Sequence, residues 1–150
     1  MIGLAVGLVL VFVIVEDLRR FHIRNLVVLL LAAGFFAACY ARGQLALVVP
    51  HALFALAGLA LLFPAFTARM IGGGDTKLLS VALLWIGPEG AFVFSLALLG
   101  SVLAYIAAAK LGSLPSRERR GRTEIPFGPS IALAWIAVIV FSAYLDVFPT

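Results

Sequence analysis

The sequence is divided into long blocks that contain almost no charge. Six such blocks can be marked, at residues 1–15, 26–41, 45–68, 78–87, 91–109 and 131–144. An apolar run of about 18 or more residues predicts a membrane-spanning helix, and shorter runs qualify when their flanks extend them. Charged residues make up only 12% of the chain, against about 25% in an average soluble protein. We therefore expect an all-α, polytopic membrane protein with about six transmembrane helices.

Six spans and short loops would use the whole length, so residues 1–150 are expected to form a single integral-membrane domain. We expect the first block to stay in place as a helix rather than to be a cleaved signal peptide. No basic segment precedes it, and no small-x-small cleavage pattern follows it.

Lysine and arginine are distributed unevenly between the loops. With six spans, ten of the 11 fall on one side and Arg42 alone falls on the other. Cytoplasmic loops carry an excess of Lys and Arg, so the first side is predicted to be cytoplasmic and both termini external. The net charge of +4 then reflects membrane topology, and no nucleic-acid partner is expected. The hydrophilic segment 112–122 is interpreted as a flexible cytoplasmic loop that contacts anionic lipid rather than substrate.

The acidic residues separate into two groups. Five of the seven have structural explanations in turns, in the basic segment or in a helical ion pair: Glu16, Glu89, Glu118, Glu124 and Asp146. Glu16 is spaced to pair with Arg20, and we expect its neutralisation to cost little. The remaining two, Asp17 and Asp75, both fall at the cytoplasmic edge of the expected bundle.

Asp75 has two possible roles. Asp is a preferred N-cap residue, and Asp75 precedes an apolar block, so a purely structural role as a helix cap stays open. The three glycines at 72–74 favour a second role, because glycine permits unusual backbone angles and close approach of another chain. A protease needs such an approach beside its catalytic acid. The segment lacks the Gly-x-x-x-x-Gly-Lys spacing of a phosphate-binding loop.

Two carboxyl groups that share one proton can hydrolyse a peptide bond. The ionised group activates a water molecule as general base, and the protonated group donates to the scissile carbonyl oxygen. This chemistry needs no metal and no organic cofactor. Cys39 is the only cysteine, and no Cys/His cluster has the spacing of a zinc site. We interpret His22 as a solvated turn residue and His51 as a residue at the membrane interface.

Three motifs resemble those of the type IV prepilin peptidases. Asp17 with RRFHIRN at 19–25 resembles their first aspartate motif, and GGGDTKLL at 72–79 resembles their Gly-x-Gly-Asp-x-Lys-Leu motif. IPFGPSIA at 125–132 resembles the segment that opens their last helix. The resemblance implies a GxGD-type protease bundle with Asp17 and Asp75 as the catalytic acids. It also implies that Gly72 and Gly74 support the site and that Lys77 shapes it.

The resemblance also implies a reaction and a location. It points to an aspartic endopeptidase that removes the short basic leader of prepilin or pseudopilin precursors after a Gly. The site would face the cytoplasm at the bacterial inner membrane, with the precursor and the lipid bilayer as partners. Two departures are visible: Arg24 stands where the family usually has proline, and the paired-cysteine methyltransferase module of longer members is missing. The chain resembles short peptidase-only forms that serve tight-adherence (Flp-type) pili, so no N-methyltransferase activity is expected.

Two alternative functions stay open. Another GxGD intramembrane protease, of the presenilin or signal-peptide-peptidase kind, would place its first aspartate in a Tyr-Asp pair deep in a helix. Asp17 instead follows Glu16 near an interface. A non-enzymatic transporter or assembly scaffold would place facing acids near the bilayer midplane, where the expected topology has none.

Overall fold

The computed structural model describes residues 2–111, 117–119, 122–124 and 126–145. These residues form five α-helices: α1 (Ile2–Arg20), α2 (Asn25–Ala41), α3 (Val48–Thr67), α4 (Gly73–Lys110) and α5 (Gly128–Leu145). A short 3-10 helix, η1 (Leu45–Leu47), leads into α3. Between α4 and α5, strands β1 (Arg117–Arg119) and β2 (Arg122–Glu124) pair antiparallel. Strand β1 falls in the segment 112–122 that was predicted to be a flexible loop, and residues 112–116 and 120–121 of that segment lie outside the described residues. Apart from this small hairpin, the expected all-helical architecture is confirmed.

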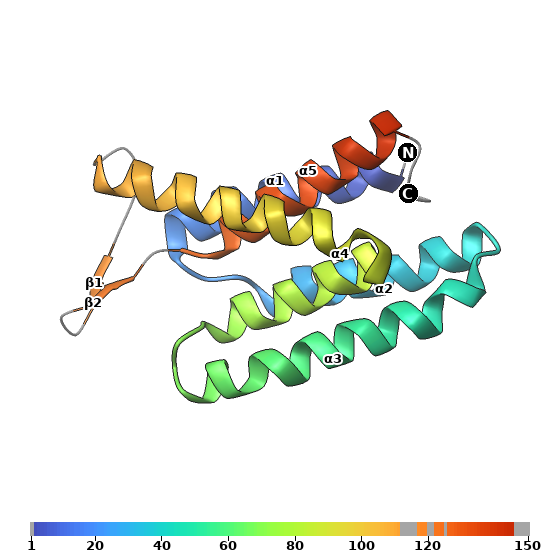
Figure 1. The fold of residues 1–150 in the computed structure, drawn as a ribbon, viewed down its shortest axis with the longest axis horizontal. Coiled ribbons are helices and arrows are strands. Elements are labelled where there is room, and N and C mark those ends of the chain that lie inside the picture. The colour runs from blue at the N-terminus through green and yellow to red at the C-terminus, as the bar shows by residue number, and fades with distance from the viewer. Residues whose placement is uncertain (1, 112–116, 120–121, 125, 146–150) are drawn as a thin grey trace.

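Helix α4 consists of two arms that meet at a kink. Gly87 has φ 68° and ψ 178°, a conformation that favours glycine, and Pro88 follows it. Figure 1 shows the chain reversing direction there. The apolar blocks expected at 78–87 and 91–109 are thus the two arms of one kinked helix. The tight turn predicted at 87–90 is reduced to a single non-helical residue.

His51 stabilises the first arm of α4 just before the kink. Pro88 has no N–H to donate to the carbonyl of Leu84 four residues earlier. His51, from α3, donates through Nδ1 to this carbonyl oxygen at 2.9 Å. The depth of His51 at the membrane interface stays a prediction, whereas its ring is buried and makes a helix-to-helix hydrogen bond. It replaces a backbone bond that the proline removes.

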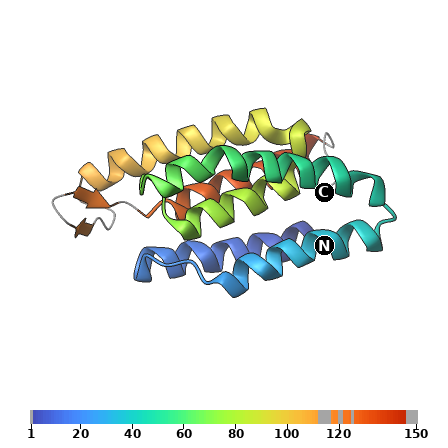
Figure 2. The same cartoon turned by 90° about the horizontal axis from the view of Figure 1, so that it is seen from below.

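The interior and the exterior of the bundle are both apolar. Helix α4 packs against α3 and α5, and α1 packs against α5. Figure 2 shows α1 and α2 together on one side of the other three helices. The largest fully buried side chains include Leu10, Leu78, Phe94 and Trp135. On α3, by contrast, most leucine and phenylalanine side chains are exposed, which suits contact with lipid rather than with water.

Two helical stretches, Leu45–Thr67 and Gly73–Lys110, are long and apolar enough to cross a membrane. The structure is therefore compatible with a membrane protein, and the expectation of six crossings stays a prediction. Two ends of the bundle can be distinguished in Figure 1. The end of α1 and the starts of α2, α4 and α5 lie at one, called the Asp17 end here. The start of α1, the end of α2 and the kink of α4 lie at the other, the Gly87 end.

Candidate active site

Asp17 lies in the last turn of α1, where its side chain is only 4% exposed. The helix ends through Phe21, whose φ of 52° is left-handed and whose N–H donates to the carbonyl of Asp17 at 2.8 Å. This reversal turns the following Ile23 into the bundle, where it is buried. The short α1–α2 turn therefore places an apolar side chain directly beside a buried carboxyl group.

Asp75 lies in the first turn of α4 but does not cap the helix. The N-cap residue is Gly72, and no side chain makes a cap hydrogen bond. Thr76 donates to the carbonyl of Gly72 through both its backbone N–H and its hydroxyl, each at 3.0 Å. The helix begins at Gly73, five residues before the start expected at Leu78. The cap interpretation of Asp75 was therefore wrong, and its carboxyl group is left for another role.

The glycines before Asp75 make room for specific neighbours. A Cβ atom on Gly72 would lie 2.9 Å from Oδ2 of Asp75, so this carboxyl group rests against bare backbone. A Cβ atom on Gly74 would lie 3.3 Å from Cβ of Ile23. Gly74 thus lets the α1–α2 turn pack closely against the start of α4. Both glycines have steric reasons in the structure, beyond the flexibility that their sequence suggested.

The two aspartates come together at the start of α5. A Cβ atom on Gly128 would lie 2.6 Å from Oδ2 of Asp17 and 3.0 Å from Cδ1 of Ile23. The backbone N–H of Gly128 is within reach of both carboxyl groups, and the two aspartates interact electrostatically with each other. Oδ2 of Asp17 is buried and has no hydrogen-bond partner among the described residues. A buried carboxyl oxygen without a hydrogen-bond partner can accept a hydrogen bond from a water molecule or from the proton of a second carboxyl group.

Gly128 had not been singled out as a site residue. It belongs to the IPFG segment, but its contribution is a backbone N–H at a helix N-terminus, where the helix dipole favours negative charge. A side-chain pattern does not reveal such a donor. Only its place in the third motif indicated that the start of this helix matters.

Two more polar residues lie within electrostatic range of Asp17. His22, in the α1–α2 turn, is exposed as expected and interacts electrostatically with the Asp17 carboxyl group. Tyr105, on the second arm of α4, is buried and interacts electrostatically with the same group. Tyr105 was missed, although a polar aromatic side chain inside an apolar block is a sign of a specific partner. Asp17 therefore has polar neighbours from three segments of the chain.

Lys77 lies on the outside of the site. Its Nζ donates to Oδ1 of Asn25 at 3.1 Å, which joins the start of α4 to the start of α2. The side chain of Lys77 is exposed. Its expected role in shaping the site stays a prediction. The hydrogen bond to Asn25 is one way in which Lys77 could hold the starts of α2 and α4 together.

Glu16, next to Asp17 in the sequence, is buried and forms an ion pair. Its side chain is 7% exposed, and Oε1 accepts a hydrogen bond from Nε of Arg24 at 2.6 Å. The expected partner, Arg20, is only at 4.0 Å. Arg24 has φ −71° and ψ 132°, angles that a proline also adopts. Arginine in place of proline thus preserves the turn and adds an ion pair beside Asp17. The expectation that neutralising Glu16 costs little stays a prediction.

The Glu16–Arg24 pair can be tested against the proline that the turn would also accept. We expect Arg24→Pro to lower the thermal stability of the purified protein, because it leaves the buried Glu16 carboxylate without its closest partner. Leaving a buried polar group unpaired costs about 1–3 kcal/mol in folding free energy. The double variant Glu16→Gln/Arg24→Pro should recover most of that loss, since an amide is less costly to bury than a charge. Equal melting temperatures for Arg24→Pro and the wild type would show that the pair contributes nothing.

The fold and the site define a class of protein: an apolar helical bundle with two carboxyl groups that meet at one end. Residues 4–109, well over half of the chain, match the model of the type IV leader peptidase family. The chain belongs to this family, which confirms the resemblance and indicates a leader-peptidase-like protease. The matched range includes both aspartates and the three glycines, whereas Gly128 lies beyond it. Searches of curated proteins and of solved structures found no significant match.

Proposed function

We propose that the chain is an aspartic endopeptidase that removes the short basic leader of prepilin or pseudopilin precursors after a Gly. The observation that carries this proposal is the meeting of Asp17 and Asp75 around the N–H of Gly128. Their carboxyl groups come from helices far apart in the sequence. Family membership supplies the reaction class, and the paired acids supply a mechanism within it.

The proposed mechanism uses one proton shared between two acids. Ionising both carboxyl groups would place like charges side by side in a partly buried site, so one proton stays with the pair. The ionised group takes a proton from water as it attacks the scissile carbonyl carbon, and the protonated group donates to the carbonyl oxygen. The N–H of Gly128 stabilises the remaining negative charge. The C–N bond then breaks as the acid that took the proton from water donates it to the leaving amine nitrogen, while the other acid takes a proton back from a hydroxyl of the gem-diol. These steps need no metal and no cofactor.

Substrate is proposed to enter from the side of Asp75. Asp75 and the glycines before it are partly or fully exposed, whereas Asp17 is buried. An extended leader can lie against the bare backbone of Gly72 and reach the pair from there. The small glycine at the cleavage point would suit this approach, because a larger side chain would hold the scissile carbonyl away from Asp75.

The reaction can be tested directly with purified protein in detergent. We expect it to cut a prepilin after the leader Gly in the presence of a strong chelator, with the new N-terminus read by mass spectrometry. A precursor with that Gly replaced by Val should stay intact. Loss of cleavage on chelation, with recovery when zinc is added, would contradict the two-carboxyl mechanism.

The location proposed for the site is the cytoplasmic face of the bacterial inner membrane. Six crossings, with α4 contributing two, would place Arg42 outside and the Asp17 end inside. Reporter fusions after Arg42 and after Arg120 are expected to give opposite signals, external for the first and cytoplasmic for the second. Matching signals would contradict this topology and the orientation of the site.

The position of the acids favours this function over its alternatives. Asp17 is in the last turn of α1 and Asp75 in the first turn of α4, so both lie at an end of the bundle. A protease that cuts within spanning helices, or a transporter that uses intramembrane charge, is expected to hold its acids deeper. A leader that precedes a membrane-spanning segment is best cut at the interface.

A further inference from the structure

A cavity of about 270 Å³ lies at the Gly87 end of the bundle, away from the aspartates. Its walls come from α1, α2, the connection from α2 through η1 to the start of α3, the region of the α4 kink and α5. They are mostly apolar: Val6, Phe35, Trp85, Ile86, Trp135 and Ile139. The volume is just below the roughly 300–1,000 Å³ of pockets that enclose a small molecule. It suits part of one extended apolar chain.

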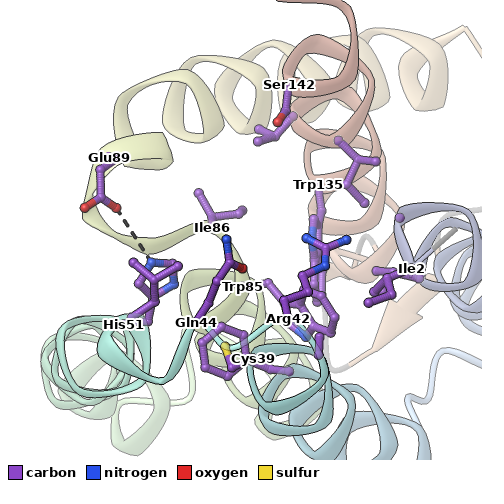
Figure 3. Close-up of a pocket in the computed structure, with 17 residues that line it drawn as sticks. Ile2, Cys39, Arg42, Gln44, His51, Trp85, Ile86, Glu89, Trp135 and Ser142 are labelled. Atoms are coloured by element: carbon purple, nitrogen blue, oxygen red, sulfur yellow. Dashed lines mark ion pairs between the residues drawn. The ribbon is translucent and has the colours of Figure 1, made fainter. Parts of the chain in front are cut away.

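The cavity also has a polar edge with unused hydrogen-bond donors. The guanidinium of Arg42 and the amide of Gln44 both extend into it in Figure 3. Among the described residues, neither side chain has an ion-pair or hydrogen-bond partner. Across the cavity, Glu89 is 60% exposed and lies 3.7 Å from Nε2 of His51, so its charge is directed toward the ring. The side with Arg42 and Gln44 is therefore the one suited to an anion.

These features together point to one kind of ligand. A guanidinium beside an amide offers several N–H donors to the oxygens of a phosphate. Apolar walls next to these donors suit a hydrocarbon chain attached to that phosphate. The exposed apolar side chains elsewhere on the bundle indicate that lipid is the surrounding medium. We propose that this cavity binds a phospholipid, with part of an acyl chain between α1, α5 and Trp85 and the phosphate at Arg42 and Gln44.

The proposal can be tested by lipid retention in detergent, measured by native mass spectrometry with two probes. Dioleoyl phosphatidylglycerol carries the phosphate, and dioleoylglycerol has the same chains without it. Arg42→Gln is expected to weaken phosphatidylglycerol binding about tenfold, because it removes a charge-assisted hydrogen bond, and to leave dioleoylglycerol binding unchanged. Arg42 is exposed, so this variant should fold normally.

A matched pair of substitutions on α5 tests the apolar part. Ile139 lines the cavity, whereas the adjacent Val140 is 62% exposed on the outside of the helix. Ile139→Trp should fill the cavity and reduce retention of both lipids, and Val140→Trp should leave retention unchanged. Equal phosphatidylglycerol retention by Arg42→Gln and the wild type would overturn the phosphate site. Equal retention of lipid by Ile139→Trp and Val140→Trp would overturn the proposed site for the acyl chain. Both overturning results are expected if detergent or a protein partner, rather than phospholipid, occupies the cavity.

This binding is independent of the proposed proteolysis. Asp17→Asn is expected to retain phosphatidylglycerol as the wild type does, although it cannot cleave a prepilin. Reduced retention by this variant would link the cavity to the acids and overturn the proposal of a separate lipid site. Failure of either proposal can thus be recognised without reference to the other.

Discussion

Asp17→Asn and Asp75→Asn are each expected to reduce prepilin cleavage by about a thousandfold or more, as removal of one member of a catalytic unit does. Asparagine keeps the size of the side chain but can neither accept the proton of the attacking water nor share one. Cleavage rates of purified variants, compared at equal concentration of folded protein, measure the effect. Both variants should insert into the membrane and elute from size-exclusion chromatography as the wild type does.

A structural role for Asp75 predicts a much smaller effect. An acid in the first turn of a helix stabilises it through the dipole by roughly 0.3–1 kcal/mol, too little to account for a thousandfold loss. Glu16→Gln is a poor control, because Glu16 is buried and paired with Arg24. Ser80→Ala is better matched: Ser80 lies on the same helix, and its hydroxyl donates to the carbonyl of Thr76 at 2.9 Å. Substantial proteolysis by either asparagine variant would remove the carboxyl pair from the mechanism.

Gly128→Ala is expected to reduce the kcat/KM for cleavage by about a hundredfold, the effect of displacing catalytic groups by about 1 Å. The new methyl group would lie 2.6 Å from Oδ2 of Asp17 and 3.0 Å from Ile23, so the carboxyl group or the start of α5 must shift. Either movement separates the N–H of Gly128 from the acids. Steady-state kinetics with a prepilin peptide measure the loss.

Gly100→Ala is the matched control for this substitution. Gly100 lies within the second arm of α4, and a Cβ atom there meets nothing within 4 Å. Alanine within a helix is more stable than glycine by roughly 0.5–1 kcal/mol, so this variant should be active and slightly more stable. Wild-type activity in Gly128→Ala would show that the start of α5 is not part of the site.

The features that follow from local sequence were predicted well. Uncharged blocks predicted the helical architecture. The approach of a substrate chain to the glycines beside Asp75 stays a prediction, and in the structure Gly74 packs against Ile23 of the same chain. The start of α4 was placed too late because Gly73 and Gly74 are poor helix formers, yet Gly72 caps the helix and Ile23 packs on Gly74. Tertiary packing overrides helix propensity at these positions.

Features that depend on distant contacts could not be read from spacing. The spacing of Glu16 favoured Arg20 within the same helix, whereas the closer partner, Arg24, lies beyond the turn. The hydrogen bond from His51 is to the carbonyl of Leu84, 33 positions further along the chain. This carbonyl is available because Pro88 has no N–H to donate to it. The hydrogen-bond donor at Gly128 is its backbone N–H, so the residue type does not reveal that it lies within reach of the two aspartates. Each of these contacts exists only once the helices have assembled.

The place of Gly128 at the start of α5 has a consequence for the biosynthesis of the protein. The acids belong to α1 and α4, which leave the ribosome before α5 does. On the proposed mechanism, the carboxyl pair lacks its backbone donor until α5 has been made and packed. A partly synthesised chain would therefore carry both acids in the membrane without cutting neighbouring precursors. Proteolytic competence would arise in one step, when the last described helix joins the bundle.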